Sequence, residues 1–247
     1  MAMHPNEQSP NQPHPNSPRP GTARSDTARP GTPQPRGSRL VELTVPARTA
    51  VVTCECQNGV LGADAVFPAL AEAADKAGLI GNIRTLTAAA RAAGVPVLHC
   101  TALRRDDGLG ANRNARLFAA AAKAPVALAP GSGPAALHPG IGADPERDLV
   151  LPRLHGLGPF QDTGLGSVLR NLGARTLVCV GVSLNVALLE LAFGAVDAGF
   201  QVVLPRDAVA GTPPGYADAV LAHTLALVAT VTDTATLADR WSAVQTS

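Results

Sequence analysis

The feature that most constrains the fold is an alternation of short apolar runs and longer helix-like stretches between residues 40 and 247. Residues 224–231 fit either a helix or a strand, and we expect a helix that runs into a short last strand. Strands that are apolar throughout and separated by helices are typical of a parallel sheet covered on both faces. The pattern predicts an α/β fold: a three-layer α-β-α, Rossmann-like domain with a parallel sheet of about six strands. The other runs typical of strands are residues 50–54, 95–100, 149–151, 176–180 and 201–204.

An acidic residue follows the first of these runs. In TAVVTCECQNGVLG, Glu55 lies where a carboxylate loses hydration unless another group compensates it. Ligands of such sheets bind beyond the carboxyl ends of the strands, near the point where the strand order reverses. Because side chains alternate along a strand, we expect Cys54 and Cys56 to point into the core and Glu55 to face a cleft. The alternative is a carboxylate held only by N–H groups of the turn.

The first 39 residues differ in composition from the rest. They contain nine prolines and many Ser, Asn, Gln and Thr residues, but almost no large apolar side chains. Such a segment cannot bury enough surface to fold, and it has no apolar core of a secretory signal. We expect residues 1–39 to be a disordered tail, either solvated or acting as a contact arm, and residues 40–247 to form one domain.

The composition excludes several classes of function. Without the tail, 15 Lys and Arg stand against 17 Asp and Glu, which gives no support for a nucleic-acid surface, and no apolar run reaches membrane-spanning length. No GxxxxGKS/T motif, no GxGxxG between a strand and a helix, and no GxSxG is present. The four cysteines form no CxxC pair, which indicates buried, reduced thiols and a cytoplasmic location. We expect no metal site and no cofactor.

Four segments in order resemble the isochorismatase-like hydrolase superfamily, which includes nicotinamidases, carbamoylsarcosine amidases and isochorismatases. AVVTCECQNGVLG is similar to an opening strand with an Asp-x-Gln-Asn signature, and LPRLHGLGPFQDTGL is similar to a loop with a lysine followed by Phe-x-x-Thr-x-Leu. The third segment resembles a strand, a cis-peptide turn, the nucleophile helix and a strand ending in Asp-Ala; it reads GARTLVCVGVSLNVALLELAFGAVDAGFQVVLPRDAVAG. HTLALVATVTDTATL resembles the closing elements. The resemblance covers roughly residues 47–241, implies the isochorismatase-like fold, and places a cis peptide at Val182–Ser183.

The resemblance implies a site built from an aspartate, a lysine and a cysteine. Glu55 stands at the aspartate position and Ala187 stands at the cysteine position. Counting back from Phe160 puts Leu154 at the lysine position. A covalent route cannot run at this site without the thiol. Isochorismatases resemble this pattern with a small residue in place of the cysteine, and are thought to protonate a vinyl ether while water attacks. The resemblance thus implies a non-cysteine hydrolase with Glu55 as the acid.

Neighbouring residues are further catalytic candidates. Arg153 could replace the charge of the lysine, bind a substrate carboxylate bidentately, or be an ordinary surface arginine. His155, in the loop RLHGLGPF, could contact substrate, transfer protons, or only bond within its loop. We expect His99 to be satisfied in the core or at the edge of the cleft.

Substrate contacts are expected from five residues: Gln57, Asn112, Phe160, Ser183 and Asn185. Asn112 belongs to an expected lid loop, and Asn185 could instead cap the following helix. The sequence predicts an isochorismatase-like hydrolase for a small polar or carboxylated metabolite, forming a homo-oligomer and lacking nucleic-acid and membrane partners. The alternative is a catalytically silent binding or scaffold protein on the same fold.

Overall fold

The computed structural model describes residues 36–244 and contains one six-stranded parallel sheet. The strands follow the order β3-β2-β1-β4-β5-β6, so the order reverses between β1 and β4. This confirms the predicted parallel sheet, and it places the reversal, where ligands of such sheets bind, next to the first strand. The strands are β1 (Thr49–Cys54), β2 (Val97–Ala102), β3 (Leu149–Arg153), β4 (Thr176–Gly181), β5 (Gln201–Pro205) and β6 (Thr230–Thr232).

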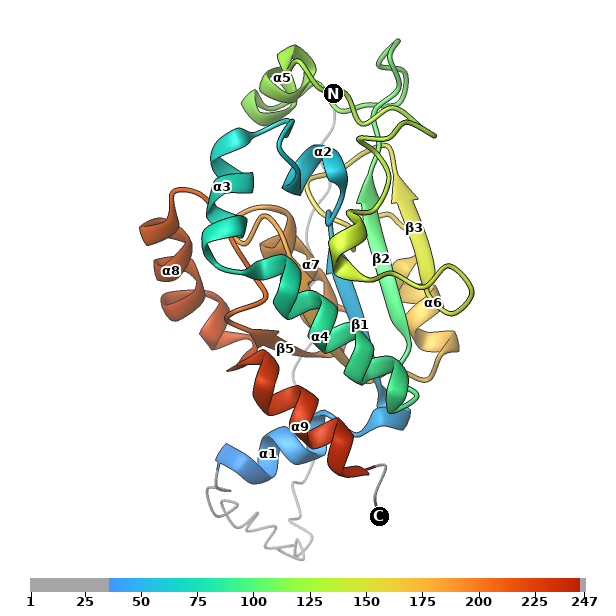
Figure 1. Ribbon diagram of the computed structural model, residues 1–247, viewed down its shortest axis with the longest axis vertical. Helices are drawn as coiled ribbons and strands as arrows, with labels where there is room; N and C mark the ends of the chain where they lie inside the picture. Colours follow the sequence, from blue (N-terminus) through green and yellow to red (C-terminus); the bar gives the residue numbers. More distant parts are fainter. Residues whose placement is uncertain (1–35, 245–247) are drawn as a thin grey trace, which may run out of the picture. The chain divides into compact units, whose positions relative to one another are not determined.

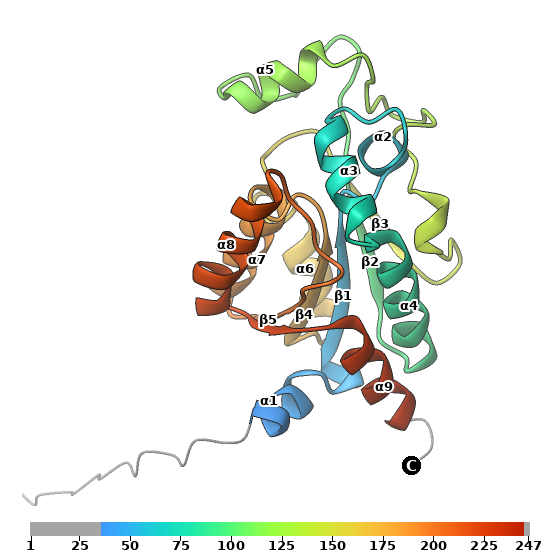
Figure 2. The same ribbon diagram turned by 60° about the vertical axis from the view of Figure 1, so that its left-hand side comes forward.

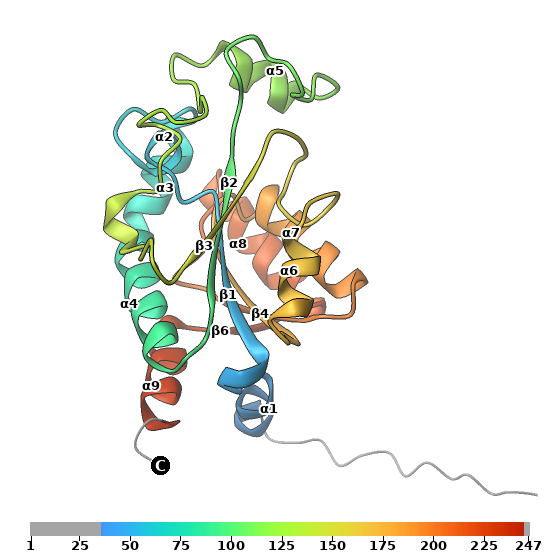
Figure 3. The same ribbon diagram turned by 90° about the vertical axis from the view of Figure 1, so that its right-hand side faces the viewer.

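Helices cover both faces of the sheet. Helices α3, α4 and α9 lie on one face and α6, α7 and α8 on the other, which gives the three predicted layers (Figures 1, 2 and 3). No helix among residues 36–244 is long and apolar enough to cross a membrane. The helices are α1 (Arg36–Leu43), α2 (Asn58–Leu61), α3 (Pro68–Lys76), α4 (Leu79–Ala92), α5 (Arg116–Lys123), α6 (Leu165–Asn171), α7 (Ala187–Asp197), α8 (Pro214–His223) and α9 (Thr234–Val244). Short 3-10 turns occupy Pro46–Arg48, Pro139–Ile141 and Leu225–Leu227.

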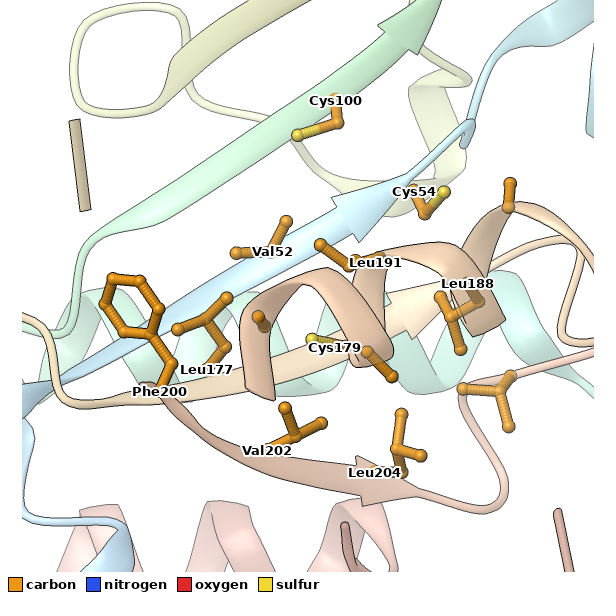
Figure 4. Close-up of a cluster of buried hydrophobic side chains, with 14 of the residues drawn as sticks. Val52, Cys54, Cys100, Leu177, Cys179, Leu188, Leu191, Phe200, Val202 and Leu204 are labelled. Carbon is orange, nitrogen blue, oxygen red and sulfur yellow. The ribbon is translucent and has the colours of Figure 1, made fainter. Parts of the chain in front are cut away.

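The sheet separates two apolar cores. Val52 packs in the core beneath α6, α7 and α8, whereas its neighbour Val51 packs in the core beneath α3, α4 and α9. Both side chains are fully buried, because β1 lies in the middle of a sheet covered on both sides. Figure 4 shows the first core, with side chains of β1, β2, β4 and β5 meeting those of α7. The central strands are apolar at every position because both of their faces are buried.

The cysteines are buried and free, as predicted, but they are not arranged as predicted. Cys54 packs in the core on the α7 side (Figure 4), while Cys56 packs in the core on the α4 side. The expectation that the two thiols share one face was therefore wrong. Strand alternation ends at Cys54, because Glu55 adopts a left-handed backbone conformation with φ of 54°.

The amino-terminal boundary falls near the limit of the described residues. Most of the predicted tail, residues 1–39, lies outside them, and α1 begins at Arg36, ahead of the predicted domain start at Leu40. Leu40 is buried in the α4-side core. The indole Nε1 of Trp241 in α9 donates to the carbonyl of Thr44 over 3.0 Å, so the segment after α1 is tied to α9.

A buried polar network lies beside α4. His99 Nε2 is 3.0 Å from Asp148 Oδ2, and His99 Nδ1 is 2.8 Å from Thr53 Oγ1. A neutral ring that donates from Nε2 and accepts the Thr53 hydroxyl at Nδ1 satisfies both ring nitrogens. Burial lowers the pKa of His99 and outweighs the opposing effect of Asp148, and the nearby Arg91 lowers it further. The ring is therefore neutral although it contacts a carboxylate.

This network predicts a pH-dependent stability. The pKa of His99 is lowered in the folded protein, so the unfolded chain binds this proton first. We therefore expect the free energy of unfolding to fall as the pH drops below about 6.5, the ordinary histidine value. Urea unfolding at pH 7.5 and 5.5 measures this change, which the His99→Gln variant should show less strongly. The exposed His155 is the control: His155→Gln should keep the full pH dependence, and an undiminished dependence in His99→Gln would contradict the assignment.

Candidate functional site

Glu55 leaves the sheet at the carboxyl end of β1. Its left-handed backbone is unusual for a residue with a side chain, and such conformations cluster at functional sites. Two hydrogen bonds hold it: the Glu55 N–H donates to the Cys100 carbonyl over 2.8 Å, and the Glu55 carbonyl accepts from the Gln57 N–H over 2.9 Å. The side chain lines a cavity of about 490 Å³. The turn thus delivers the carboxylate to the edge of the sheet where ligands bind.

Arg153, the last residue of β3, is the direct partner of Glu55. Its Nη2 donates a short hydrogen bond to Glu55 Oε1, and the arginine side chain is only 5% exposed. Burial acts to lower the pKa of Arg153, but the Glu55 carboxylate outweighs it and raises that pKa. The Arg153 Nε and Nη1 atoms are buried and lack an acceptor within residues 36–244. The guanidinium therefore has donors left for a further oxygen.

The cation beside Glu55 comes from Arg153, the residue that was expected as a possible replacement for the charge of the lysine. Counting back from Phe160 placed the lysine-equivalent position at Leu154, but the side chain that meets Glu55 comes from Arg153. Leu154 is 37% exposed and lines the cavity wall. Arg153 is carried to Glu55 by the pairing of β3 with β2, in which Arg153 stands opposite Ala102. Register within the sheet decided which residue supplies the charge.

Several N–H groups at the turn between β4 and α7 have no acceptor among the described residues, and those of Ser183 and Ala187 are two of them. The Val182–Ser183 peptide bond is cis, as the resemblance implied. The N–H groups of Val182 and Leu184 donate to Cys54 and Ala210, but those of Ser183 and Ala187 have no acceptor in the described part of the chain. Ser183 and Ala187 both line the cavity, and Ala187 is only 2% exposed. Ser183 is half-buried, and Ala187 is the first residue of α7, where N–H groups have no partner within the helix. Both N–H groups are therefore available to an oxygen of a ligand.

Strand β1, which leads to Glu55, and strand β4, which leads to the Ser183 turn, approach each other closely. At Gly181, the last residue of β4, an added Cβ would lie 2.2 Å from the Cys54 carbonyl oxygen. With a φ of 111°, Gly181 also has a backbone that other residues rarely adopt. Only glycine fits here, so β1 and β4 bring Glu55 and the Ser183 turn to the same cavity.

Two of the predicted substrate contacts lie elsewhere. Gln57 is fully buried, and its amide donates to the carbonyls of Ala102 and Ala135 and accepts from the Ala102 N–H. Phe160 packs edge-on against Phe200, with ring centroids 6.2 Å apart, under α7. Neither residue lines the cavity. We correct both to structural residues, because their side chains are already used within the fold.

The other predicted contacts lie at the cavity. Asn112 lines it, and its Oδ1 accepts from the Gly156 N–H over 2.8 Å, which joins two loops of the mouth. Asn185 donates to the Thr212 carbonyl over 3.2 Å and leaves a buried Oδ1 without a partner in residues 36–244; it does not cap α7. His155 lines the cavity and is exposed.

One positioning residue was missed from the sequence. The Glu190 carboxylate in the first turn of α7 accepts from the N–H groups of Phe160 and Gln161, over 3.1 and 2.8 Å. It thereby fixes the end of the loop that carries His155. The only available signal was an acidic residue near the start of an apolar helix, a position that the helix dipole favours.

The thiols are unsuited to nucleophilic attack. Burial raises the pKa of Cys56 and of Cys100 to about 12 each, and it raises those of Cys54 and Cys179 as well. A thiol with a raised pKa is poorly reactive, because the thiolate is the nucleophile. No cluster of three metal-ligating His, Cys, Asp or Glu side chains occurs among residues 36–244.

Comparisons with known proteins identify the family and support the fold. The family model for the isochorismatase domain matches residues 49–236. The chain is similar to a cysteine hydrolase from Pseudomonas syringae pv. phaseolicola 1448A, with a TM-score of 0.70, 24% identity, and coverage of 81% of this chain and 95% of that one. It is also similar to an isochorismatase family protein from Desulfovibrio vulgaris subsp. vulgaris str. Hildenborough (TM-score 0.67, 25% identity, coverage 77% and 96%). N-carbamoylsarcosine amidase from Thermoplasma acidophilum is a third similar structure (TM-score 0.60, 20% identity, coverage 76% and 96%). The search of curated proteins found no match.

Proposed function

The chain belongs to the isochorismatase family, and from that premise we propose that it hydrolyses a small metabolite with water, not a cysteine, as the nucleophile. The metabolite is polar or carboxylated at the end that reacts. One observation carries the proposal: the uncommitted N–H groups of Ser183 and Ala187 belong to the same cavity as the Glu55–Arg153 pair. An oxyanion site and a carboxylate that lie together without a thiol suit direct attack by water.

The proposed reaction needs only these groups. Water adds to the carbonyl carbon of an amide or ester while the Glu55 carboxylate takes its proton. The N–H groups of Ser183 and Ala187 stabilise the oxyanion that forms. The intermediate then expels the leaving group, which receives the proton held by Glu55. No bond to the protein forms, and the products are an acid and an amine or alcohol.

Arg153 has the role of the family's lysine in this proposal. Its ion pair with Glu55 holds one oxygen of the carboxylate in place at the edge of the cavity. The isochorismatase resemblance implied the other role, in which Glu55 protonates a vinyl ether; the N–H groups of Ser183 and Ala187 favour instead the oxyanion of a carbonyl substrate. The two unpartnered guanidinium nitrogens could also hold a substrate carboxylate. We assign His155 to proton transfer at the mouth of the cavity.

The absence of a covalent intermediate is a testable prediction. We expect nicotinamide and aliphatic amides or esters to leave the protein mass unchanged during incubation, because Ala187 carries no nucleophile and the four thiols are buried. Mass spectrometry of the intact protein measures this, with the urea-unfolded protein and iodoacetamide as a positive control for the thiols. An acyl adduct on any cysteine of the folded protein would overturn the water route.

The second candidate is a protein that binds the metabolite without turning it over. The observation that favours it is the direct contact of Arg153 with Glu55, which already occupies one oxygen of the carboxylate. Isothermal titration combined with product analysis separates the two candidates. Binding with no product from any amide, ester or vinyl ether supports the second candidate.

We also propose a cellular location and a homo-oligomeric assembly for the protein. Four buried, free thiols suit a reducing compartment such as the cytoplasm. Exposed apolar side chains, among them Leu227 at 82% and Val150 at 51%, support a homo-oligomer. Sedimentation of the purified protein tests the assembly, and a monomer at micromolar concentration would reject it.

A further inference from the structure

The lining of the cavity is mostly apolar. Its polar side chains are those of Glu55, Arg153, Ser183, Asn185, Arg104, Asn112, His155 and Thr212. Most of the larger apolar side chains, which we call the apolar walls, come from α2, from the segment before α3, from α3, from α5 and from four loop positions. They are Val60, Val66, Phe67, Leu70, Leu117, Phe118, Leu103, Leu128, Leu154 and Leu157.

The apolar walls are incompletely covered by the protein itself. Leu117, Leu154 and Leu157 are 37%, 37% and 46% exposed, and all three line this cavity. Contiguous exposed apolar surface is unfavourable in water and commonly marks a binding site. At about 490 Å³ the cavity lies within the range of about 300–1,000 Å³ typical of small-molecule sites.

Helix α5 contributes no side chain to either of the two apolar cores of the described residues. None of the residues Arg116–Lys123 is buried, and the side chains of Leu117, Phe118 and Ala121 are turned to the cavity. Figures 1 and 3 show α5 beyond the carboxyl-terminal ends of the strands, separate from the helices that cover the sheet. An amphipathic helix gains its stability by covering apolar surface. A ligand between α5 and α3 would supply that surface.

We propose that the substrate carries an extended apolar body, an alkyl chain or unsubstituted ring, which packs between α3 and α5 while its polar end meets Glu55. This inference rests on the proposed function for the identity of the reacting end, but the apolar wall is independent of turnover. Phe118 and Leu117 determine the specificity for this body. The site therefore prefers molecules larger and less polar than a simple amide such as acetamide.

A homologous series tests the inference. Straight-chain primary amides and straight-chain carboxylates of two to ten carbons are titrated into the full-length protein by calorimetry. Burying one methylene is expected to tighten binding about fourfold, so affinity should rise with chain length until the cavity is filled. Phe118→Ser should flatten this rise, whereas Leu172→Ser, which removes an apolar side chain that is 40% exposed and lies outside the cavity, should not. Circular dichroism checks that both variants are folded.

The outcomes for the inference and for the proposed function are distinguishable. Affinity that rises with chain length supports the inference, whether or not any amide is hydrolysed; binding without hydrolysis rejects only the proposed reaction. Affinity that is flat in both series, undetectable binding throughout, or a Phe118→Ser variant with an unchanged rise overturns the inference. Hydrolysis that is independent of chain length overturns it too, while leaving the hydrolase proposal intact.

Discussion

Replacing Glu55 with glutamine should lower kcat/KM for the hydrolysed substrate by about 10²–10⁴-fold, the usual contribution of a general base. Glutamine has nearly the same size but cannot take the proton of the attacking water. Binding should change much less, because the cavity walls and the N–H groups of Ser183 and Ala187 remain. Calorimetry and steady-state kinetics on the same protein preparation measure the two effects separately.

Matched variants control this result. Glu55→Asp keeps a carboxylate and should retain more activity than Glu55→Gln, although a shift of the base by one bond length also costs rate. Glu72→Gln removes an exposed carboxylate paired with Lys76 and should leave kinetics unchanged. Since Glu55→Gln leaves the buried Arg153 charge without its partner, the assay temperature must lie below the unfolding transition of each variant. Equal activity of Glu55→Gln and the unmodified protein would exclude Glu55 as the base.

Replacing Asp148 with asparagine should lower the free energy of unfolding by about 3–5 kcal/mol, the usual cost of breaking a buried ion pair on one side. The Asp148 side chain is 2% exposed and accepts from Arg91 Nε over 2.9 Å and from the Asp144 N–H over 2.8 Å. Burial raises the pKa of Asp148, but these bonds and the one with His99 outweigh it and lower that pKa. The negative charge of Asp148 is thus fully compensated. Its loss leaves the Arg91 guanidinium without its carboxylate partner. Urea unfolding at pH 7.5 measures the effect.

A second pair of variants shows whether the loss comes from the stranded charge. The double variant Arg91→Met, Asp148→Asn should cost less than Asp148→Asn alone, because no unpaired buried charge remains while the asparagine oxygen can still accept from His99 and the Asp144 N–H. Glu72→Gln breaks an exposed ion pair and should leave the unfolding midpoint nearly unchanged. An Asp148→Asn variant as stable as Glu72→Gln would show that the network does not stabilise the fold.

The sequence by itself determined the layered parallel sheet. Runs such as those around Val52 and Val178 are apolar without alternation, and only a strand buried on both faces requires that pattern. It also placed Glu55 at the carboxyl end of the first strand and Ala187 at the start of α7, since local chain order fixes both. Strand limits were less certain: β2 covers Val97–Ala102, two residues later than residues 95–100 expected from composition, because pairing with its neighbours sets the ends.

Only the tertiary structure decided how the site is assembled. Counting along the loop before Phe160 pointed to Leu154, whereas sheet register put Arg153 on Glu55. The left-handed turn at Glu55 sent Cys54 and Cys56 to opposite faces, which strand periodicity could not foresee. The apolar walls come from segments that are far apart in sequence and meet only above the sheet. Residue periodicity reports which face is buried, but contacts between distant segments depend on loop conformation and register, which no local pattern encodes.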